Sequence, residues 1–106
     1  MGQSNGERRP RHSVGALGAA TSQLSDILEE AARTGTHESV IAAFANIRAR
    51  LHRDPHHFGE PLYHLRKLKM TVRCVAVIPL FVEYGVHDEQ PVVVIRRVLY
   101  LTAGAA

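Results

Sequence analysis

The sequence predicts an α+β domain, in which an N-terminal helical hairpin packs on a C-terminal antiparallel sheet of three to four strands. Two observations support this prediction. The C-terminal part of the chain holds three apolar runs rich in Val, Ile, Tyr and Phe, which is the composition of β-strands. The part before it holds two segments whose apolar residues recur at the spacing of one helical face.

The chain has 106 residues, of which 45% are hydrophobic, and this length fits a single domain, which we place at residues 13–106. Residues 1–12 are polar and basic, with two glycines and one proline, and we expect them to form a disordered tail. Residues 12–17 (HSVGAL) fit either a short strand or the start of a helix, and their glycine favours neither.

Residues 21–33 are predicted to form the first helix. Gly35 follows as a natural stop, because glycine adopts the left-handed conformation that ends many helices. The apolar face of this helix is formed by residues at positions 0, 3, 4 and 7 of one stripe: Leu24, Ile27, Leu28 and Ala31.

A second helix is expected to begin at Thr36 or His37 and to end before Pro55, which pushes the residue before it out of the helical conformation. Its connection to the first helix is short, so the two helices should form an antiparallel hairpin. The predicted buried stripe consists of Ile41, Phe44, Ile47 and Leu51.

Three strands are predicted at residues 69–78, 80–87 and 92–101, separated by Pro79 and by a polar turn that ends in Pro91. Such short connections leave no room for a crossover, so neighbouring strands must run antiparallel. Side-chain alternation led us to expect Arg73 and Glu83 on one face of the sheet, together with Arg96 or Arg97. A cross-strand ion pair is the simplest use of these residues.

The positive charge of the chain is concentrated between residues 48 and 73. This segment holds seven cationic side chains and two acids, a net charge of +5, whereas the whole chain has a net charge of +3. It also holds four of the seven histidines. Such a concentration suits a polyanion such as RNA or DNA, although a solvated helix end followed by a polar loop would have the same composition.

Cys74 is the only cysteine, so no internal disulfide can form, and a lone cysteine in an apolar strand usually packs as a small hydrophobic side chain. No segment approaches the roughly 18 apolar residues of a membrane span. We therefore expect a cytoplasmic protein with no membrane partner. His52 and His56 do not share a helical face, because Pro55 lies between them, and no metal site or cofactor is predicted.

Five short motifs, in order along residues 36–101, resemble those of the RelE/ParE superfamily, the small cytoplasmic toxins of bacterial toxin–antitoxin modules. They are residues 47–55 (IRARLHRDP), 58–62 (FGEPL), 68–73 (LKMTVR), 82–89 (VEYGVHDE) and 92–98 (VVVIRRV). The resemblance implies a toxin-like protein. It would be a ribosome-dependent mRNA endoribonuclease that needs no metal, or a ParE-type inhibitor of a protein target such as gyrase. The alternative is a non-catalytic module of the same fold that binds protein or nucleic acid.

The resemblance also implies roles for individual residues. In a ribonuclease of this family, the 2′-hydroxyl attacks the adjacent phosphate, which requires a base, an acid and cations. Arg73 would clamp the phosphate, and Glu83, His64 or His87 would exchange protons. Neighbouring phosphates would be held by further cations: Arg66, Lys67, Lys69, Arg96 and Arg97. Alternatively, Arg73 pairs with Glu83, and the lysines keep a strand edge soluble.

The implied partners follow from the same resemblance. An antitoxin peptide would add as a strand to a free edge of the sheet, or would lay a helix between the helices and the sheet. RNA or the ribosome is the implied target. A homodimer formed through the same edge is the competing use of that surface.

Overall fold

The structure, a computed structural model, describes residues 11–101 of the chain. Most of the tail predicted at residues 1–12 therefore lies outside the described residues. Eight elements follow one another: β1 (Ser13–Ala16), α2 (Gly18–Thr34), α3 (His37–Arg53), α4 (Pro55–Phe58), β2 (Glu60–Leu65), β3 (Met70–Val77), β4 (Leu80–His87) and β5 (Val92–Tyr100). Neither long helix of residues 11–101 has the length of apolar sequence that crossing a membrane requires.

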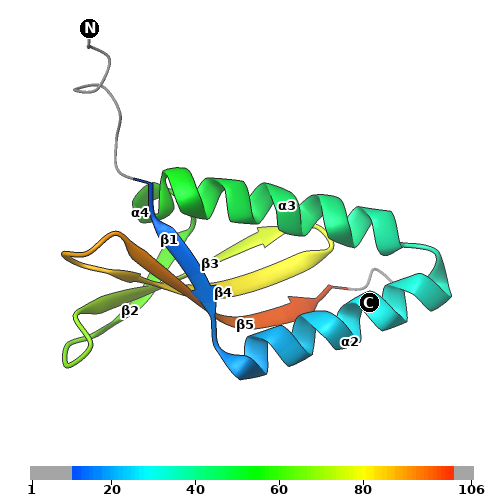
Figure 1. The fold of residues 1–106 in the computed structure, drawn as a ribbon, viewed down its shortest axis with the longest axis horizontal. Coiled ribbons are helices and arrows are strands. Elements are labelled where there is room, and N and C mark those ends of the chain that lie inside the picture. The colour runs from blue at the N-terminus through cyan, green and yellow to red at the C-terminus, as the bar shows by residue number, and fades with distance from the viewer. Residues whose placement is uncertain (1–10, 102–106) are drawn as a thin grey trace, which may run out of the picture.

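The α+β class is confirmed, and so is the antiparallel arrangement of the last three strands. The rest of the predicted sheet is wrong. It has five strands in the order β1-β5-β4-β3-β2, and β1 runs parallel to β5 at one edge. A strand therefore precedes the helical hairpin (Figure 1). Strand β2 lies at the other edge and pairs antiparallel with β3.

Strand β1 decides between the two readings of residues 12–17. The amide of Ser13 donates a hydrogen bond to the carbonyl oxygen of Pro91 (2.8 Å), and the amide of Leu17 donates one to that of Ile95 (2.9 Å). Four residues that include a glycine carry almost no local strand signal. This strand forms because β5 supplies hydrogen-bonding partners from the far end of the chain.

Both long helices pack on one face of the sheet. The core cluster combines residues of α2 and α3 with alternate residues of β4 and β5, among them Leu80, Val82, Tyr84 and Val86. The α3 stripe differs from the prediction at its first turns, where Val40 and Ala43 are buried and Ile41 is 46% exposed. Val40 and Ile41 are both at a helical spacing that fits an apolar face with Ile47, so the sequence does not decide between them. In the structure, the packing of α3 on the sheet buries Val40 and leaves Ile41 exposed.

The turns gather at two opposite ends of the molecule. Figure 1 shows the β2–β3 turn, the β4–β5 turn, α4 and the beginning of β1 at one end, and the α2–α3 and β3–β4 turns at the other. The amide of His12 donates to the carbonyl oxygen of His52 (2.9 Å), and this bond fixes the start of β1 beside the last turn of α3. We call the first of these two ends the α4 end.

Candidate functional site

Arg73 lies on the helix-covered face of the sheet. Its guanidinium donates to the carbonyl oxygen of Gly59 and lies beside the hydroxyl of Tyr84, the residue opposite it on β4. That hydroxyl accepts a hydrogen bond from the Gly59 amide (2.9 Å) and donates one to the carbonyl oxygen of Pro55 (3.2 Å). Arg73 and Tyr84 together therefore fasten α4 and the connection after it to the sheet.

Glu83 lies on the opposite face of the sheet, because it neighbours the buried Tyr84 and is paired with Cys74. Its carboxylate accepts a hydrogen bond from the hydroxyl of Tyr63 (3.4 Å) and lies 3.6 Å from Nε of Arg96. The expectation that Arg73 and Glu83 share a face is therefore wrong. Of the ion pairs expected for Glu83, the one with Arg96 is present.

Strand β5 places its two arginines in the middle of the sheet. The pairing of β4 with β5 shifts by one residue after Glu83, so that Arg96 becomes the extra residue of a bulge and Arg97 stands opposite Glu83. Arg97 is exposed. Strand alternation puts Arg97 on the helix-free face, away from Arg73, so the predicted cations do not form one cluster.

Other predicted residues do meet, at the α4 end. Nε2 of His64 donates to Oδ2 of Asp88 (2.6 Å), and the hydroxyl of Thr71 donates to Oδ1 (3.1 Å). The hydrogen bond from His64 is the main reason that the pKa of Asp88 is lowered, with a smaller contribution from Thr71. Asp88 thus connects the β4–β5 turn with strands β2 and β3.

His87 is held by the same turn. Its Nδ1 accepts hydrogen bonds from the backbone amides of Glu89 (3.1 Å) and Gln90 (2.9 Å). An accepting Nδ1 means that the neutral ring carries its proton on Nε2. The turn therefore fixes both the orientation and the tautomer of this imidazole.

The β2–β3 turn carries the remaining predicted cations. Arg66, Lys67 and Lys69 are all exposed, as is Leu68 between them. Lys69 adopts a positive φ of 51° and lies 3.7 Å from the carboxylate of Glu89. Within residues 11–101, no ion pair engages Arg66 or Lys67.

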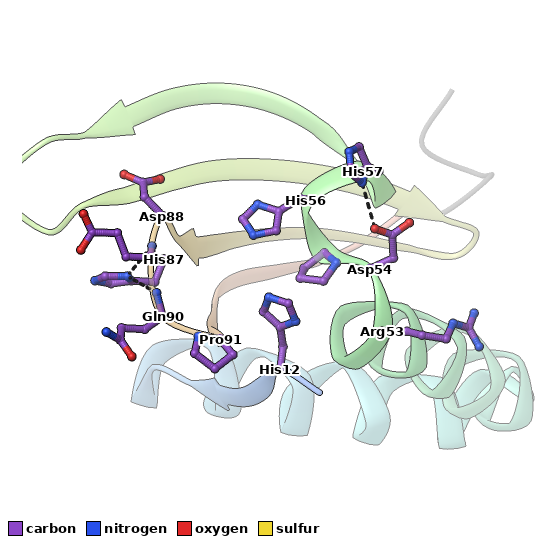
Figure 2. Close-up of a pocket in the computed structure, with 11 residues that line it drawn as sticks. His12, Arg53, Asp54, His56, His57, His87, Asp88, Gln90 and Pro91 are labelled. Carbon is purple, nitrogen blue, oxygen red and sulfur yellow. Dashed lines mark hydrogen bonds and ion pairs between the residues drawn. The ribbon is translucent and has the colours of Figure 1, made fainter. Parts of the chain in front are cut away.

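A cavity of about 360 Å³ opens at the α4 end, between α4 and the β4–β5 turn (Figure 2). Its lining includes four histidines from three separate parts of the chain: His12, His56, His57 and His87. The rings of His12 and His56 meet edge to face, with 5.6 Å between their centroids. In Figure 2 these two rings point toward each other at the mouth of the gap that faces Pro91.

His12 is a partly buried member of this group. Burial lowers its pKa, and the neighbouring His56 lowers the pKa further, while Asp54 acts in the opposite direction. Its Nδ1 is buried and has no hydrogen-bond partner within the described residues. Its backbone carbonyl accepts a hydrogen bond from Nδ1 of His52 (2.8 Å).

The sequence reasoning did not select His12, His56 or this cavity. The available signal was the concentration of histidines between residues 48 and 73, but the distance along the chain to His12 hid the cluster. Only the docking of β1 against the end of α3 brings His12 to His56. Among residues 11–101, no group of three or more His, Cys, Asp or Glu side chains has the geometry to hold a metal ion.

Comparisons of the chain with family models, with curated proteins and with solved structures found no match. The fold and the geometry of the α4 end are therefore the observations on which a function has to be argued.

Proposed function

We propose that this protein is a toxin-like module of RelE/ParE type that binds RNA through the tip of its β2–β3 hairpin and does not cut it. The observation that carries the proposal is the cationic tip. Arg66, Lys67 and Lys69 are exposed at one end of the molecule, and the first two have no acidic partner among the described residues. Exposed lysine and arginine side chains bind phosphates and release counterions, which is the main source of nucleic-acid affinity.

The absence of cleavage follows from the positions of the predicted catalytic residues. Arg73 is engaged by the Gly59 carbonyl on the helix-covered face, and Glu83 is engaged by Arg96 on the other face. An attacking hydroxyl, its base and the phosphate clamp must lie within hydrogen-bonding reach of one another. Arg73 and Glu83 lie on opposite faces and do not meet that requirement. The other two candidate bases are engaged elsewhere, His64 by Asp88 and His87 by the backbone amides of its turn.

The family assignment rests on the five sequence motifs, which fall on the following elements. Residues 47–55 end α3 and begin α4, residues 58–62 connect α4 to β2, and residues 68–73 open β3. The last two motifs fall on β4 with its turn and on β5. The five-stranded sheet with a parallel edge strand goes beyond the layout that the resemblance implied. As further parts of the proposal, the protein acts in the cytoplasm, its target is the ribosome or the mRNA on it, and an antitoxin neutralises it.

The test is a pair of charge reversals. The double variant Arg66→Glu/Lys67→Glu should bind a short single-stranded RNA at least about tenfold more weakly than the wild type, with a salt slope shallower by about 1.4, because each lost phosphate contact removes about 0.7. Fluorescence anisotropy at several salt concentrations gives both quantities.

The matched control is Arg33→Glu/Arg48→Glu, which changes the net charge equally at exposed positions on the two long helices. It should keep nearly wild-type affinity. Equal losses in both double variants would mean that net charge, and not the hairpin, governs binding. RNA recovered from the same mixtures should be intact, and wild-type-dependent fragments would contradict the non-cleaving part of the proposal.

A further inference from the structure

Six of the seven histidines gather at the α4 end. Four line the cavity, His52 holds the backbone of His12, and His64 holds Asp88. The seventh, His37, begins α3 at the opposite end of the molecule (Figure 1). Histidine is the side chain whose charge ordinarily changes near neutral pH. The charge of this end therefore depends on pH far more than that of the rest of the surface.

The sign of the cavity lining changes with histidine protonation. While the imidazoles are neutral, one arginine and three acids leave the lining with a net charge of −2. Protonation of His12, His56 and His57 brings it to +1, and His87 is left out because its Nδ1 already accepts two backbone hydrogen bonds. An anion is thus repelled in one state and attracted in the other.

The three carboxylates of the lining already have partners. Asp54 accepts a hydrogen bond from Nδ1 of His57 (3.0 Å), Asp88 is held by His64 and Thr71, and Glu89 lies near Lys69. Figure 2 shows His57 and Arg53 turned away from the gap, whereas the rings of His12 and His56 face it. These two rings are therefore the groups that a ligand in the cavity would meet.

His12 lacks an acceptor for its charged form. Both ring nitrogens of a protonated imidazole are donors, and Nδ1 of His12 is buried without a partner among the described residues. A second cation at His56 would stand 5.6 Å away between ring centroids, which disfavours charging both rings in the absence of an anion. An oxyanion in the cavity, beside the two rings, would offset the repulsion between their positive charges.

We propose that the cavity between α4 and the β4–β5 turn binds a tetrahedral oxyanion, such as a sulfate or a phosphate group, on the cavity side of the protonated rings of His12 and His56. The proposal does not depend on the RNA-binding function of the hairpin. Anion binding here is coupled to proton uptake, so the affinity rises as the pH falls.

Other titratable and charged groups surround the two rings, and each contributes to the pH dependence. They come from α3 and its end, from α4, and from β4 with its turn: His52, Arg53, Asp54, His57, His87, Asp88 and Glu89. The pKa of Asp88 is lowered by its hydrogen bond from His64, so this acid keeps its charge as the histidines gain theirs. The change in affinity therefore follows the histidines.

Sulfate is the appropriate probe, because it remains a dianion throughout the range in which histidine titrates. We expect it to bind about tenfold or more tightly at about pH 5.5 than at about pH 8, with chloride at matched ionic strength as the control. Nuclear magnetic resonance of the imidazole ring protons reports each histidine separately. Sulfate should shift the ring-proton resonances of His12 and His56 and leave those of His37 unchanged.

The variant His12→Gln/His56→Gln should lose this binding, and His37→Gln should retain it. The backbone groups of His12 hold β1 to α3, and they are unchanged in the variant. The amide spectrum outside the α4 end shows whether the variant is folded. If it is not, the single variant His56→Gln tests the same ring pair, because His56 is an exposed residue.

A second arm identifies the source of the oxyanion by adding a uridine hexanucleotide in place of sulfate at the lower pH. Shifts of His12 and His56 with both ligands show that a nucleic-acid phosphate is accepted, and shifts with sulfate alone show a site for free oxyanions. Equal sulfate binding at both pH values, or wild-type binding by the double variant, would overturn the proposal. Loss of RNA binding by the hairpin variant would leave it standing.

Discussion

Tyr84 is the residue on which the α4 end depends most. Its side chain is fully buried, its ring stacks against Phe58 at 6.5 Å, and its hydroxyl bonds to Gly59 and Pro55. Burial raises its pKa, and the hydrogen bond from the Gly59 amide and the neighbouring Arg73 partly oppose that effect. One phenol therefore joins strand β4 to the segment that builds one wall of the cavity.

Tyr84→Phe should lower the free energy of unfolding by about 1–3 kcal/mol, because the buried Gly59 amide and the Pro55 carbonyl oxygen lose their partner. Tyr63→Phe is the matched control. Its hydroxyl is exposed and makes one long bond to Glu83, so the loss should be within about 0.5 kcal/mol. Urea unfolding at neutral pH measures both, and equal losses would show that the Tyr84 hydroxyl is not what fastens α4.

Single residues also show where sequence reasoning stopped. The type of Arg73 suggested a phosphate clamp, but its strand position gives it a backbone carbonyl as partner. Nothing local indicates this, because Gly59 lies in a different element and its close approach to Cys74 depends on the absence of a side chain. Conversely, His64 and His87 were selected as titrating residues, and the structure does place both around Asp88 and its turn.

Among the helices and strands, β1 is the element that local sequence did not predict. The predicted helices and the last three strands carry strong periodicity, and their observed bounds differ from the prediction by a few residues at most. A parallel edge strand of four residues has no such pattern, and its pairing with β5 spans most of the chain. Local sequence cannot encode a partner at that separation, so the strand was left open between two readings.

Replacing either of two glycines by alanine should change the free energy of unfolding, and the two changes should have opposite signs. Gly15 lies in β1 with open space where a Cβ would be, so Gly15→Ala should raise the free energy of unfolding by about 0.4–1 kcal/mol. Gly35 ends α2 with a φ of +83°, so Gly35→Ala should lower it by about 1–2 kcal/mol. Denaturant unfolding of both variants tests the assignment, and a loss at Gly15 would contradict an exposed, unstrained strand residue there.

On the scale of the whole molecule, negative charge lies on helix α2 and most of the cations and histidines lie at the α4 end. The acids Asp26, Glu29 and Glu30 lie on α2, whereas the hairpin cations and most histidines lie at the α4 end. The sequence shows the positive charge as one segment, residues 48–73, which the structure distributes over α3, α4, β2 and β3. The sequence does not indicate that the start of β1 adds His12 to this end.

Asp88 gives the molecule an acid-dependent contribution to stability. The hydrogen bond from His64 lowers its pKa in the folded state, so its stabilising effect is present above the unfolded pKa and is lost as the pH falls through the folded pKa. Asp88→Asn should therefore melt at a lower temperature than the wild type near neutral pH, and the difference should disappear in strong acid. A difference in melting temperature that is constant with pH would show that the carboxylate's charge is not involved.

The parallel pairing of β1 with β5 has a consequence for biosynthesis. Among residues 11–101, the first strand to be synthesised is matched residue by residue with the last, Ser13 with Val92 and Ala16 with Ile95. A nascent chain cannot complete the hydrogen bonds between β1 and β5 until translation has passed residue 95. A product terminated before residue 91 would lack the wall that Pro91 contributes and would leave His12 without its cavity. Translation must therefore pass Pro91 before this histidine-lined hollow can exist.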